Sequence, residues 1–306
     1  MPHRAVTRAW LVVSLVVAAV IAECSPVGTS SPSSAPPSSG PTRIPILIDV
    51  RDAVGSSRFL FAIADRENTP IGSPDMPARV AFFDLAKSET TPTATVDSRF
   101  IWTIQGTTGI YAADVNFTTP GDWAAEFTTT KDGLIETTRV KFQVAEKSPT
   151  PAIGSKAPIT KTPTLADVGG DVQRLSTDQH PDPSFYRVSV DQAITKHEPF
   201  VLVFATPAFC TSRQCGPTLD AVKAIAKDAP KITFINVEPY KLEFTGGRLQ
   251  PVLDASGQLQ ATDVTDAWGL LTEPWIFVVD RDGIVRGSYA VIASPEELKA
   301  AIAAVT

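Results

Sequence analysis

The pattern of apolar residues from Phe185 onward limits this part of the chain to an α/β arrangement. The run PFVLVFA (199–205) is continuously apolar, as expected of a strand that is buried on both faces of a sheet. Helical spacing follows in PTLDAVKAIAKDA (217–229), and KITFINV (231–237) is a second apolar run. Because such runs alternate with helical segments, the sequence predicts parallel strands joined by helices.

A pair of strands and a capped helix close this region. PWIFVVDRDGIVRGSYAVI (274–292) predicts two strands that meet at an Asp-Gly turn, which is typical of an antiparallel hairpin. Ser294 and Glu297 have the spacing of a capping box, so a helix is predicted to begin there. The predicted order over 185–306 is β-α-β-α-β-α-β-β-α. Its remaining members are a strand at FYRVSV (185–190) and short helices at DQAITKH (191–197) and Val264–Trp268.

The earlier part of the chain, from Ile44 to Val144, has a β pattern throughout. Seven short runs rich in β-branched and aromatic residues are separated by turn residues such as Pro120-Gly121. This spacing predicts an antiparallel β-sandwich, and TTGIYAADVNF resembles the tyrosine-corner strand of immunoglobulin-like folds, with Tyr111 at the corner. The segment holds no cysteine and no cluster of metal-ligand residues. It is therefore predicted to be a structural or protein-binding module whose protein partner is unknown.

Two tracts rich in proline and small polar residues flank the β segment. SPVGTSSPSSAPPSSGPT (25–42) has almost no apolar side chains to bury, so it predicts a flexible tether. EKSPTPAIGSKAPITKTPT (146–164) predicts a connector, and the irregular residues after it are expected to pack against the last domain. The predicted division is a signal peptide at 1–22, a tether at 23–43, a sandwich at 44–146, a linker and extension at 147–184, and an α/β domain at 185–306.

The N-terminal residues predict export from the cytoplasm. Basic residues precede WLVVSLVVAAVIA (10–22), an apolar run that is short for a membrane span and typical of a signal-peptide core. Cleavage after Ala22 and retention as an N-terminal anchor are both open. VIAECS also resembles the lipobox of bacterial lipoproteins, in which Cys24 would carry the lipid, although Glu23 stands where a lipobox has a small residue. In each case the chain lies outside the cytoplasmic membrane, where disulfides persist.

The composition excludes some partners. Hydrophobic residues make up 43% of the chain, which predicts that most of it folds into cores. The formal net charge is −6, and no block of lysine and arginine interrupts the mixed charges. Nucleic acid is therefore not an expected partner.

The segment FATPAFCTSRQCGPTLD (204–220) holds two of the three cysteines, in a C-x-x-x-x-C arrangement between an apolar run and a helical pattern. Such a pair can serve redox chemistry, bind a metal or staple the fold. Inside one helix, residues five apart are separated by about 7.5 Å along the axis, which is too far for a disulfide. Because proline suits the first helical position, the helix is predicted to begin near Pro217, with Cys210 and Cys215 in the preceding turn.

The element order and two motifs, AFCTSRQCGP and EPWIFVVDRDG, resemble the thioredoxin superfamily over residues 185–306. The second motif is similar to the cis-proline signature of that family, with Pro274 at the proline position and Phe277 three residues later. The resemblance implies that the peptide bond before Pro274 is cis and that this proline faces the cysteine pair.

Two charged residues could tune the thiols. The positive potential of the helix N-terminus and the guanidinium of Arg213 would favour a thiolate. Glu273, beside Pro274, would act in the opposite direction if it approached the sulfurs, by raising a thiol pKa or by accepting a proton. A position on the surface is the alternative for Glu273.

These observations predict an extracytoplasmic thiol–disulfide oxidoreductase that uses the Cys210/Cys215 pair and needs no further cofactor. Its partners would be thiols or disulfides of proteins outside the cytoplasm, and its N-terminal anchor or lipid would reach the membrane. Cys210 is the predicted attacking residue, because it follows the strand at the position where the thioredoxin-like nucleophile lies.

Another reading is a thiol peroxidase. CTSRQC resembles the C-T-x-x-x-C motif of Q-type peroxiredoxins, which would make Cys210 the peroxidatic and Cys215 the resolving residue. The sequence departs from that family at two positions. Pro207 replaces its threonine before the first cysteine, and Pro274 stands where it has an arginine.

Two non-enzymatic readings also remain. Copper handling, as in the Sco-like branch of the superfamily, uses two cysteines and a later histidine, whereas His3, His180 and His197 all precede the cysteines. No metal site is therefore predicted. In a pure binding module the disulfide would be a staple, but closing so short a loop gains little chain entropy.

Overall fold

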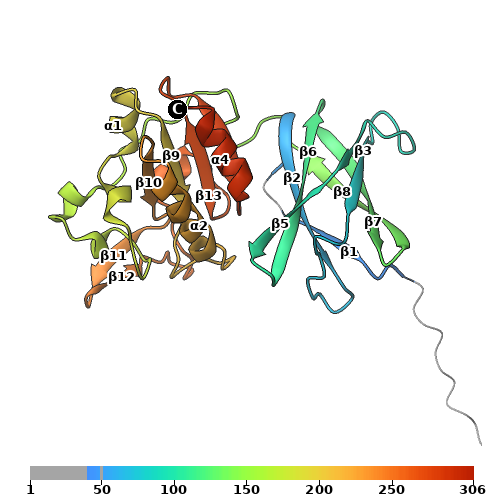
Figure 1. Ribbon diagram of the computed structural model, residues 1–306, viewed down its shortest axis with the longest axis horizontal. Coiled ribbons are helices and arrows are strands. Elements are labelled where there is room, and N and C mark those ends of the chain that lie inside the picture. Colours follow the sequence, from blue (N-terminus) through green and yellow to red (C-terminus); the bar gives the residue numbers. More distant parts are fainter. Residues whose placement is uncertain (1–39, 49–50) are drawn as a thin grey trace, which may run out of the picture. The chain divides into compact units, whose positions relative to one another are not determined.

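The computed structural model of the protein describes residues 40–48 and 51–306 (Figure 1). The predicted signal peptide, Cys24 and nearly all of the tether lie outside these described residues. Residues Pro41–Thr306 form one compact unit. No helix within the described ranges has the length and hydropathy that a membrane span requires.

The first part of the described chain consists of two four-stranded antiparallel sheets, with strand orders β1-β2-β6-β5 and β4-β3-β7-β8. Side chains of both sheets enter one core, where the rings of Phe59 and Phe82 lie 5.1 Å apart edge to face. This part is therefore a β-sandwich, as predicted. Its strands are β1 (Ile44–Leu47), β2 (Gly55–Ala64), β3 (Ala78–Asp84), β4 (Ala94–Asp97), β5 (Arg99–Ile104), β6 (Thr108–Phe117), β7 (Gly121–Lys131) and β8 (Leu134–Val144).

The seven predicted runs coincide with seven of these strands, and β4 is the one that the sequence analysis missed. It is a short edge strand whose residues alternate between half-buried and exposed, so it lacks an apolar run. The predicted role of Tyr111 is wrong in its detail. Its hydroxyl donates to the carbonyl of Met76 at 2.9 Å, 35 residues upstream, instead of to a corner a few residues away. Tyr111 therefore fastens the segment that leads into β3.

A mixed four-stranded sheet follows, in the order β10-β9-β13-β14. Strands β9 and β10 are parallel, whereas β13 is antiparallel to both β9 and β14. Every residue of β9 and β13 is buried, which explains their continuous apolar runs. The strands are β9 (Phe200–Phe204), β10 (Thr233–Val237), β13 (Trp275–Val279) and β14 (Val285–Ala290).

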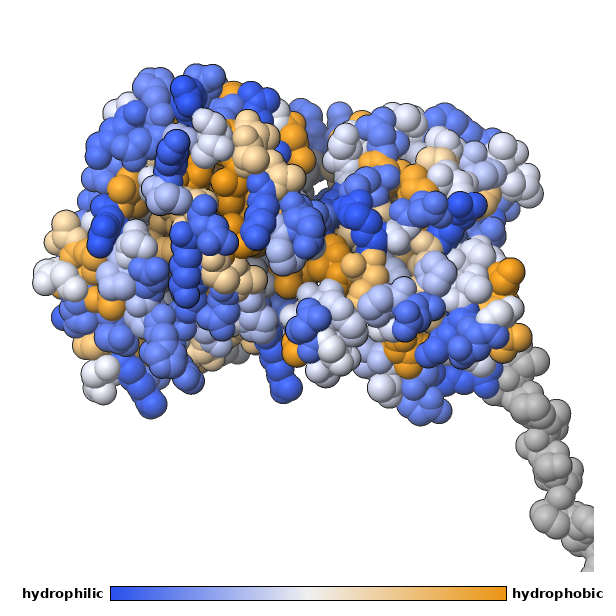
Figure 2. Space-filling view, in the orientation of Figure 1, coloured by the Kyte–Doolittle hydropathy of each residue, from blue (hydrophilic) through white to orange (hydrophobic). Residues whose placement is uncertain are grey.

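Helices cover both faces of this sheet. On one face, α2 (Cys215–Asp228) and α4 (Pro295–Ala303) pack their apolar side chains against residues of β9 and β13. On the other face, α1 (Val190–Thr195) and Trp268, which caps α3 (Asp263–Ala267), pack against the alternate residues. The face of the molecule in Figure 2 is correspondingly mostly hydrophilic, with apolar residues in small patches.

Two details of the predicted element order are wrong. FYRVSV does not form a strand, because Asp182 caps a 3₁₀ helix (Pro183–Tyr186) that buries Phe185 and Tyr186 against the sheet. A hairpin of β11 (Leu242–Thr245) and β12 (Arg248–Pro251) was missed. Its turn residues Gly246 and Gly247 both have positive φ, which is the chemistry of a two-residue hairpin turn.

The structure has the predicted capping box, and a residue of the irregular extension packs beneath β9. The Ser294 hydroxyl accepts from the Glu297 N–H, and Glu297 accepts from the Ser294 N–H, so the capping box is confirmed. In the extension after the connector, Leu175 belongs to the core beneath β9. Two further 3₁₀ helices lie in this extension, at Leu165–Val168 and Val172–Arg174.

One buried hydroxyl ties α2 to the residue that follows β14. Thr218 is 1% exposed and donates to the carbonyl of Val291 at 2.8 Å. We expect Thr218→Val to lower the free energy of unfolding by about 1–2 kcal/mol, because that carbonyl would lose its donor while the shape is kept. Urea denaturation measures the difference. The matched Thr195→Val, at an exposed hydroxyl that bonds within α1, should change it by less than about 0.5 kcal/mol. Equal effects of the two changes would contradict the assignment.

Candidate active site

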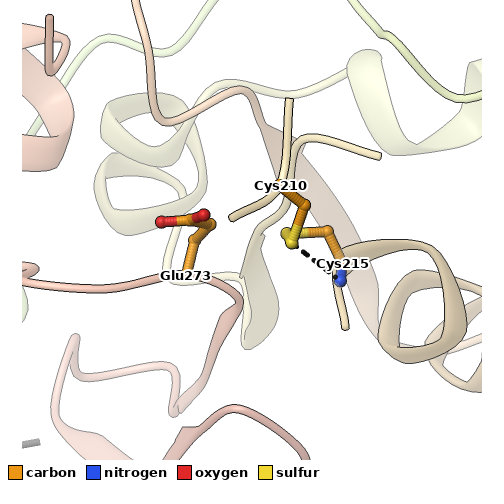
Figure 3. A group of neighbouring side chains, drawn as sticks. All are labelled: Cys210, Cys215 and Glu273. Atoms are coloured by element: carbon orange, nitrogen blue, oxygen red, sulfur yellow. Dashed lines mark hydrogen bonds between the residues drawn. A yellow bond between two sulfur atoms is a disulfide. The ribbon is translucent and has the colours of Figure 1, made fainter. Parts of the chain in front are cut away.

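The two cysteines that the sequence analysis singled out form a disulfide, with Cα atoms 5.9 Å apart. Cys210 lies in the loop after β9, and Cys215 is the first residue of α2 (Figure 3). The predicted helix start near Pro217 is therefore wrong by two residues. Pro217 is the third helical residue, where an N–H has no partner inside the helix, so proline fits there too.

The cysteines differ in exposure and in hydrogen bonding. Cys215 is fully buried, whereas Cys210 is partly exposed. The sulfur of Cys210 accepts from the backbone N–H of Cys215 at 3.1 Å and lies 3.3 Å from the hydroxyl of Ser212. The Cys215 N–H and the N-terminus of a 14-residue helix stabilise negative charge on the Cys210 sulfur. Cys210 is thus the cysteine that solvent reaches and that the helix favours as a thiolate.

Glu273 brings a carboxylate to the disulfide. Its residue is only 3% exposed, and one carboxylate oxygen and the sulfurs of Cys210 and Cys215 all lie within 4.8 Å of one another. Figure 3 shows the Glu273 side chain beside the two cysteine side chains, on a separate segment of the chain. Of the two placements that the sequence left open for Glu273, the structure has the approach to the sulfurs and not the surface position.

Neutral groups hold this carboxylate in place. Oε1 accepts from the backbone N–H of Thr211 at 2.9 Å and from its hydroxyl at 2.8 Å. Oε2 accepts from the hydroxyl of Tyr240 at 2.6 Å. Burial and the adjacent carboxylate raise the pKa of Tyr240, so it remains a donor at neutral pH. Within residues 40–48 and 51–306, no lysine, arginine or histidine forms an ion pair with Glu273.

The charges around the disulfide act on both sulfurs once it is reduced. At an effective dielectric constant of about 20, two negative charges about 5 Å apart repel by roughly 3 kcal/mol. A helix N-terminus stabilises a nearby negative charge by up to about 1 kcal/mol at an exposed site. Glu273 therefore opposes a thiolate on either cysteine. The Cys215 N–H and the N-terminus of α2 offset this opposition in part at Cys210.

The other predicted site residues include Pro274 and Arg213, which flank the site on different segments. The Glu273–Pro274 peptide bond is cis, as the resemblance implied. Arg213 is exposed, with φ of 61°, and no hydrogen bond or ion pair within the described residues joins its guanidinium to the cysteines or to Glu273. His180 and His197 are exposed, and the one group of three potential metal ligands found among the described residues is Cys210, Cys215 and Glu273. The structure therefore brings Glu273 to the cysteines but not Arg213.

A second acid, Glu238, supports the cysteine loop and was missed from the sequence. It follows β10, and its Oε1 accepts from the N–H and the hydroxyl of Thr177 at 2.6 and 2.8 Å. The Thr177 hydroxyl in turn accepts from the N–H of Ala208, two residues before Cys210. Burial raises the pKa of Glu238 to about 7, against the lowering effect of the hydroxyls of Thr206 and Thr177. A polar residue directly after a buried parallel strand was the available signal.

A groove of about 490 Å³ adjoins the loop that carries Cys210. Ala208 and Phe209 line one side of it, Thr177 and Asp178 another, and Arg248 and Leu249 of the β11–β12 hairpin a third. The groove thus lies next to the loop that carries the partly exposed Cys210.

No protein-family model matches the sequence, and no curated protein matches it significantly.

The raised pKa of Glu238 makes folding stability depend on pH. The folded state holds this proton up to about pH 7, whereas the unfolded carboxyl releases it near 4.5, so the stabilisation is present below pH 4.5 and is lost as the pH rises through 7. We expect Glu238→Gln to remove a loss of about 3 kcal/mol between pH 5 and pH 8. Urea denaturation at both pH values measures this. Exposed Glu243→Gln serves as the control, and an unchanged pH dependence in Glu238→Gln would contradict the assignment.

Proposed function

We propose that the protein is a thiol–disulfide oxidoreductase with a thioredoxin-like catalytic domain. The observation that carries the proposal is the pairing of a partly exposed Cys210 with a buried Cys215 at a helix start, with the Glu273 carboxylate within 4.8 Å of both sulfurs. A pair that exchanges disulfides needs one accessible sulfur, a second sulfur that resolves the mixed disulfide, and a group that takes its proton. In this protein Cys210 is the accessible sulfur, Cys215 the resolving sulfur and Glu273 the group that takes the proton.

The arrangement of the elements supports the proposed family. Thioredoxin-like proteins carry their cysteines after a central strand and at the start of a helix, and a cis-proline before an antiparallel strand. Cys210 follows β9, Cys215 begins α2, and Pro274 precedes β13. The strand orders of the sandwich, β1-β2-β6-β5 and β4-β3-β7-β8, correspond to the A-B-E-D and C′-C-F-G orders of immunoglobulin-like domains. We therefore also propose an immunoglobulin-like module ahead of the catalytic one, with a protein partner.

The proposed reaction begins from the dithiol form. The Cys210 thiolate attacks a substrate disulfide, a bond forms between Cys210 and one substrate sulfur, and the other substrate sulfur leaves as a thiolate. Cys215 then gives its proton to Glu273 and attacks the Cys210 sulfur. This step breaks the mixed disulfide, and the substrate departs with both sulfurs reduced. Two electrons pass from the cysteine pair to the substrate, and an external dithiol returns them.

The direction of electron flow follows from Glu273. Strongly oxidising pairs have a reduced form that is stabilised as a thiolate. Here a buried carboxylate opposes thiolates on both sulfurs, so the reduced form is not stabilised in that way. We therefore propose that the pair acts as a reductant of protein disulfides.

The peroxidase reading is less well supported. A peroxidatic thiolate needs a cationic neighbour that stabilises it and orients the peroxide. Close to Cys210 the structure has the carboxylate of Glu273, and Arg213 makes no contact with the sulfurs through a hydrogen bond or ion pair among the described residues.

We also propose, from the N-terminal sequence, that the protein works outside the cytoplasmic membrane and is anchored there through Cys24 or an uncleaved N-terminal segment.

Single cysteine variants test the reaction. In Cys215→Ser the attacking thiol remains and the resolving one is absent, so this variant should accumulate a mixed disulfide with insulin or another disulfide substrate. Cys210→Ser should accumulate none, and both variants should lose nearly all insulin reduction. Mass spectrometry of the trapped species measures the outcome. A wild-type disulfide that no dithiol reduces would overturn the redox proposal, and peroxide turnover without insulin reduction would favour the peroxidase.

The charge of Glu273 should be visible in the reactivity of the reduced protein. Glu273→Gln keeps the acceptor oxygen but removes the negative charge, so the thiolate fraction of Cys210 should rise. We expect alkylation of Cys210 by iodoacetamide at pH 7 to become several-fold faster, in a background with Cys24→Ser and Cys215→Ser that leaves one thiol. The control is Glu243→Gln in the same background. Slower alkylation of the Glu273 variant would contradict the proposed electrostatics.

A further inference from the structure

The Glu273 carboxylate is buried and accepts hydrogen bonds from neutral donors. It lies 3% exposed, and its oxygens accept from Thr211 and Tyr240. Buried charges in proteins are normally paired with an opposite charge or bound to a metal ion. In the part of the chain that the structure describes, no cationic side chain forms an ion pair with this carboxylate. In the dithiol state this carboxylate faces two sulfurs that can each lose a proton.

From this geometry we infer that the reduced site binds one zinc ion through the sulfurs of Cys210 and Cys215 and a carboxylate oxygen of Glu273. The three donor atoms lie within 4.8 Å of one another, as ligands of a single ion must. Zinc takes cysteine sulfur at about 2.3 Å and carboxylate oxygen at about 2.0–2.2 Å, usually in a tetrahedron. Two thiolates favour zinc or Cu(I), and the carboxylate favours zinc of these two, because it is the harder ligand.

The surroundings of the three ligands suit such a site. Tyr240 donates to Oε2 of Glu273, and Thr211 donates to Oε1, so both carboxylate oxygens are oriented by groups outside the ligand set. Partners of this kind fix the orientation of a ligand and raise metal affinity. Cys210 is partly exposed, so the fourth position of a tetrahedron is open to water.

Zinc and the disulfide exclude each other chemically. A two-electron reduction by a dithiol or a phosphine breaks the S–S bond, and metal binding then displaces the remaining thiol protons. While both sulfurs are bound to zinc, neither can attack a substrate disulfide or form the internal one. The zinc form is thus a resting state protected from oxidation. This consequence rests on the proposed redox function, whereas the metal site requires only that the disulfide can be reduced in the folded protein.

The test uses purified full-length protein, reduced with a phosphine under nitrogen, with thiols counted before metal is added. Zinc binding is measured by competition with a chromophoric chelator, and the ligands by the absorption of the cobalt-substituted protein. We expect one ion per reduced chain, none per oxidised chain, and sulfur-to-cobalt bands. Cys210→Ser and Cys215→Ser should each weaken zinc binding at least 100-fold, and Glu273→Gln at least tenfold. Glu243→Gln, an exposed acid on β11, should leave zinc affinity unchanged.

The glutamine variant separates a ligand from a neighbouring charge. If Glu273 only raised the energy of the thiolates, its neutralisation would ease the loss of the thiol protons, and zinc would bind more tightly. Unchanged or tighter binding to Glu273→Gln would therefore overturn the proposed ligand set. A disulfide that resists the phosphine in the folded protein, or equal zinc binding by the oxidised protein, would overturn it too. Insulin reduction with no zinc binding would leave the redox proposal standing and remove this one.

Discussion

The parallel pairing of β9 with β10 determines where the chemistry of this protein is assembled. Parallel strands end at the same edge of a sheet, so the loop with Cys210 and the segment with Tyr240 leave the sheet side by side. Strand β13 runs antiparallel to β9, with Trp275 opposite Phe204, so it begins at that same edge. Glu273 precedes β13 and therefore arrives beside the cysteines. Three distant segments meet because of one choice of strand directions.

The buried strands also set the electrostatics of that edge. The sheet beneath the site is apolar throughout β9 and β13, so it offers no charge to balance Glu273. The carboxylate is kept by hydrogen bonds alone, which are worth more when charged groups take part. Glu238 lies at the same edge. Burial raises its pKa more than its hydrogen bonds lower it, so the pKa is about 7. One sheet edge thus holds two acids with different tasks, one beside the sulfurs and one beneath their loop.

Most helices and strands around the site could be predicted from the sequence, because local patterns of residues determine them. The continuous apolar runs gave β9, β10 and β13, and the capping box at Ser294 gave α4. The predictions that were wrong concern segments whose structure depends on packing or on side-chain hydrogen bonds. Phe185 and Tyr186 are apolar enough for a strand, but the cap at Asp182 turns them into a 3₁₀ helix. The cysteine pair was found by its spacing. The approach of Glu273 and the contacts of Glu238 depend on segments distant in sequence, so no local pattern could establish them.

The four-residue spacer between the cysteines has a structural use beyond closing a loop. Thr211 and Ser212 lie within it. The backbone and hydroxyl of Thr211 donate to the Glu273 carboxylate, and the Ser212 hydroxyl donates to the Glu273 carbonyl at 3.0 Å. Arg213 then takes a left-handed conformation, which reverses the chain and returns it to Cys215. A two-residue spacer would have no room for both donors and the reversal. The longer spacer therefore allows a buried acid to lie beside the disulfide, because its own residues supply the hydrogen bonds that hold that acid.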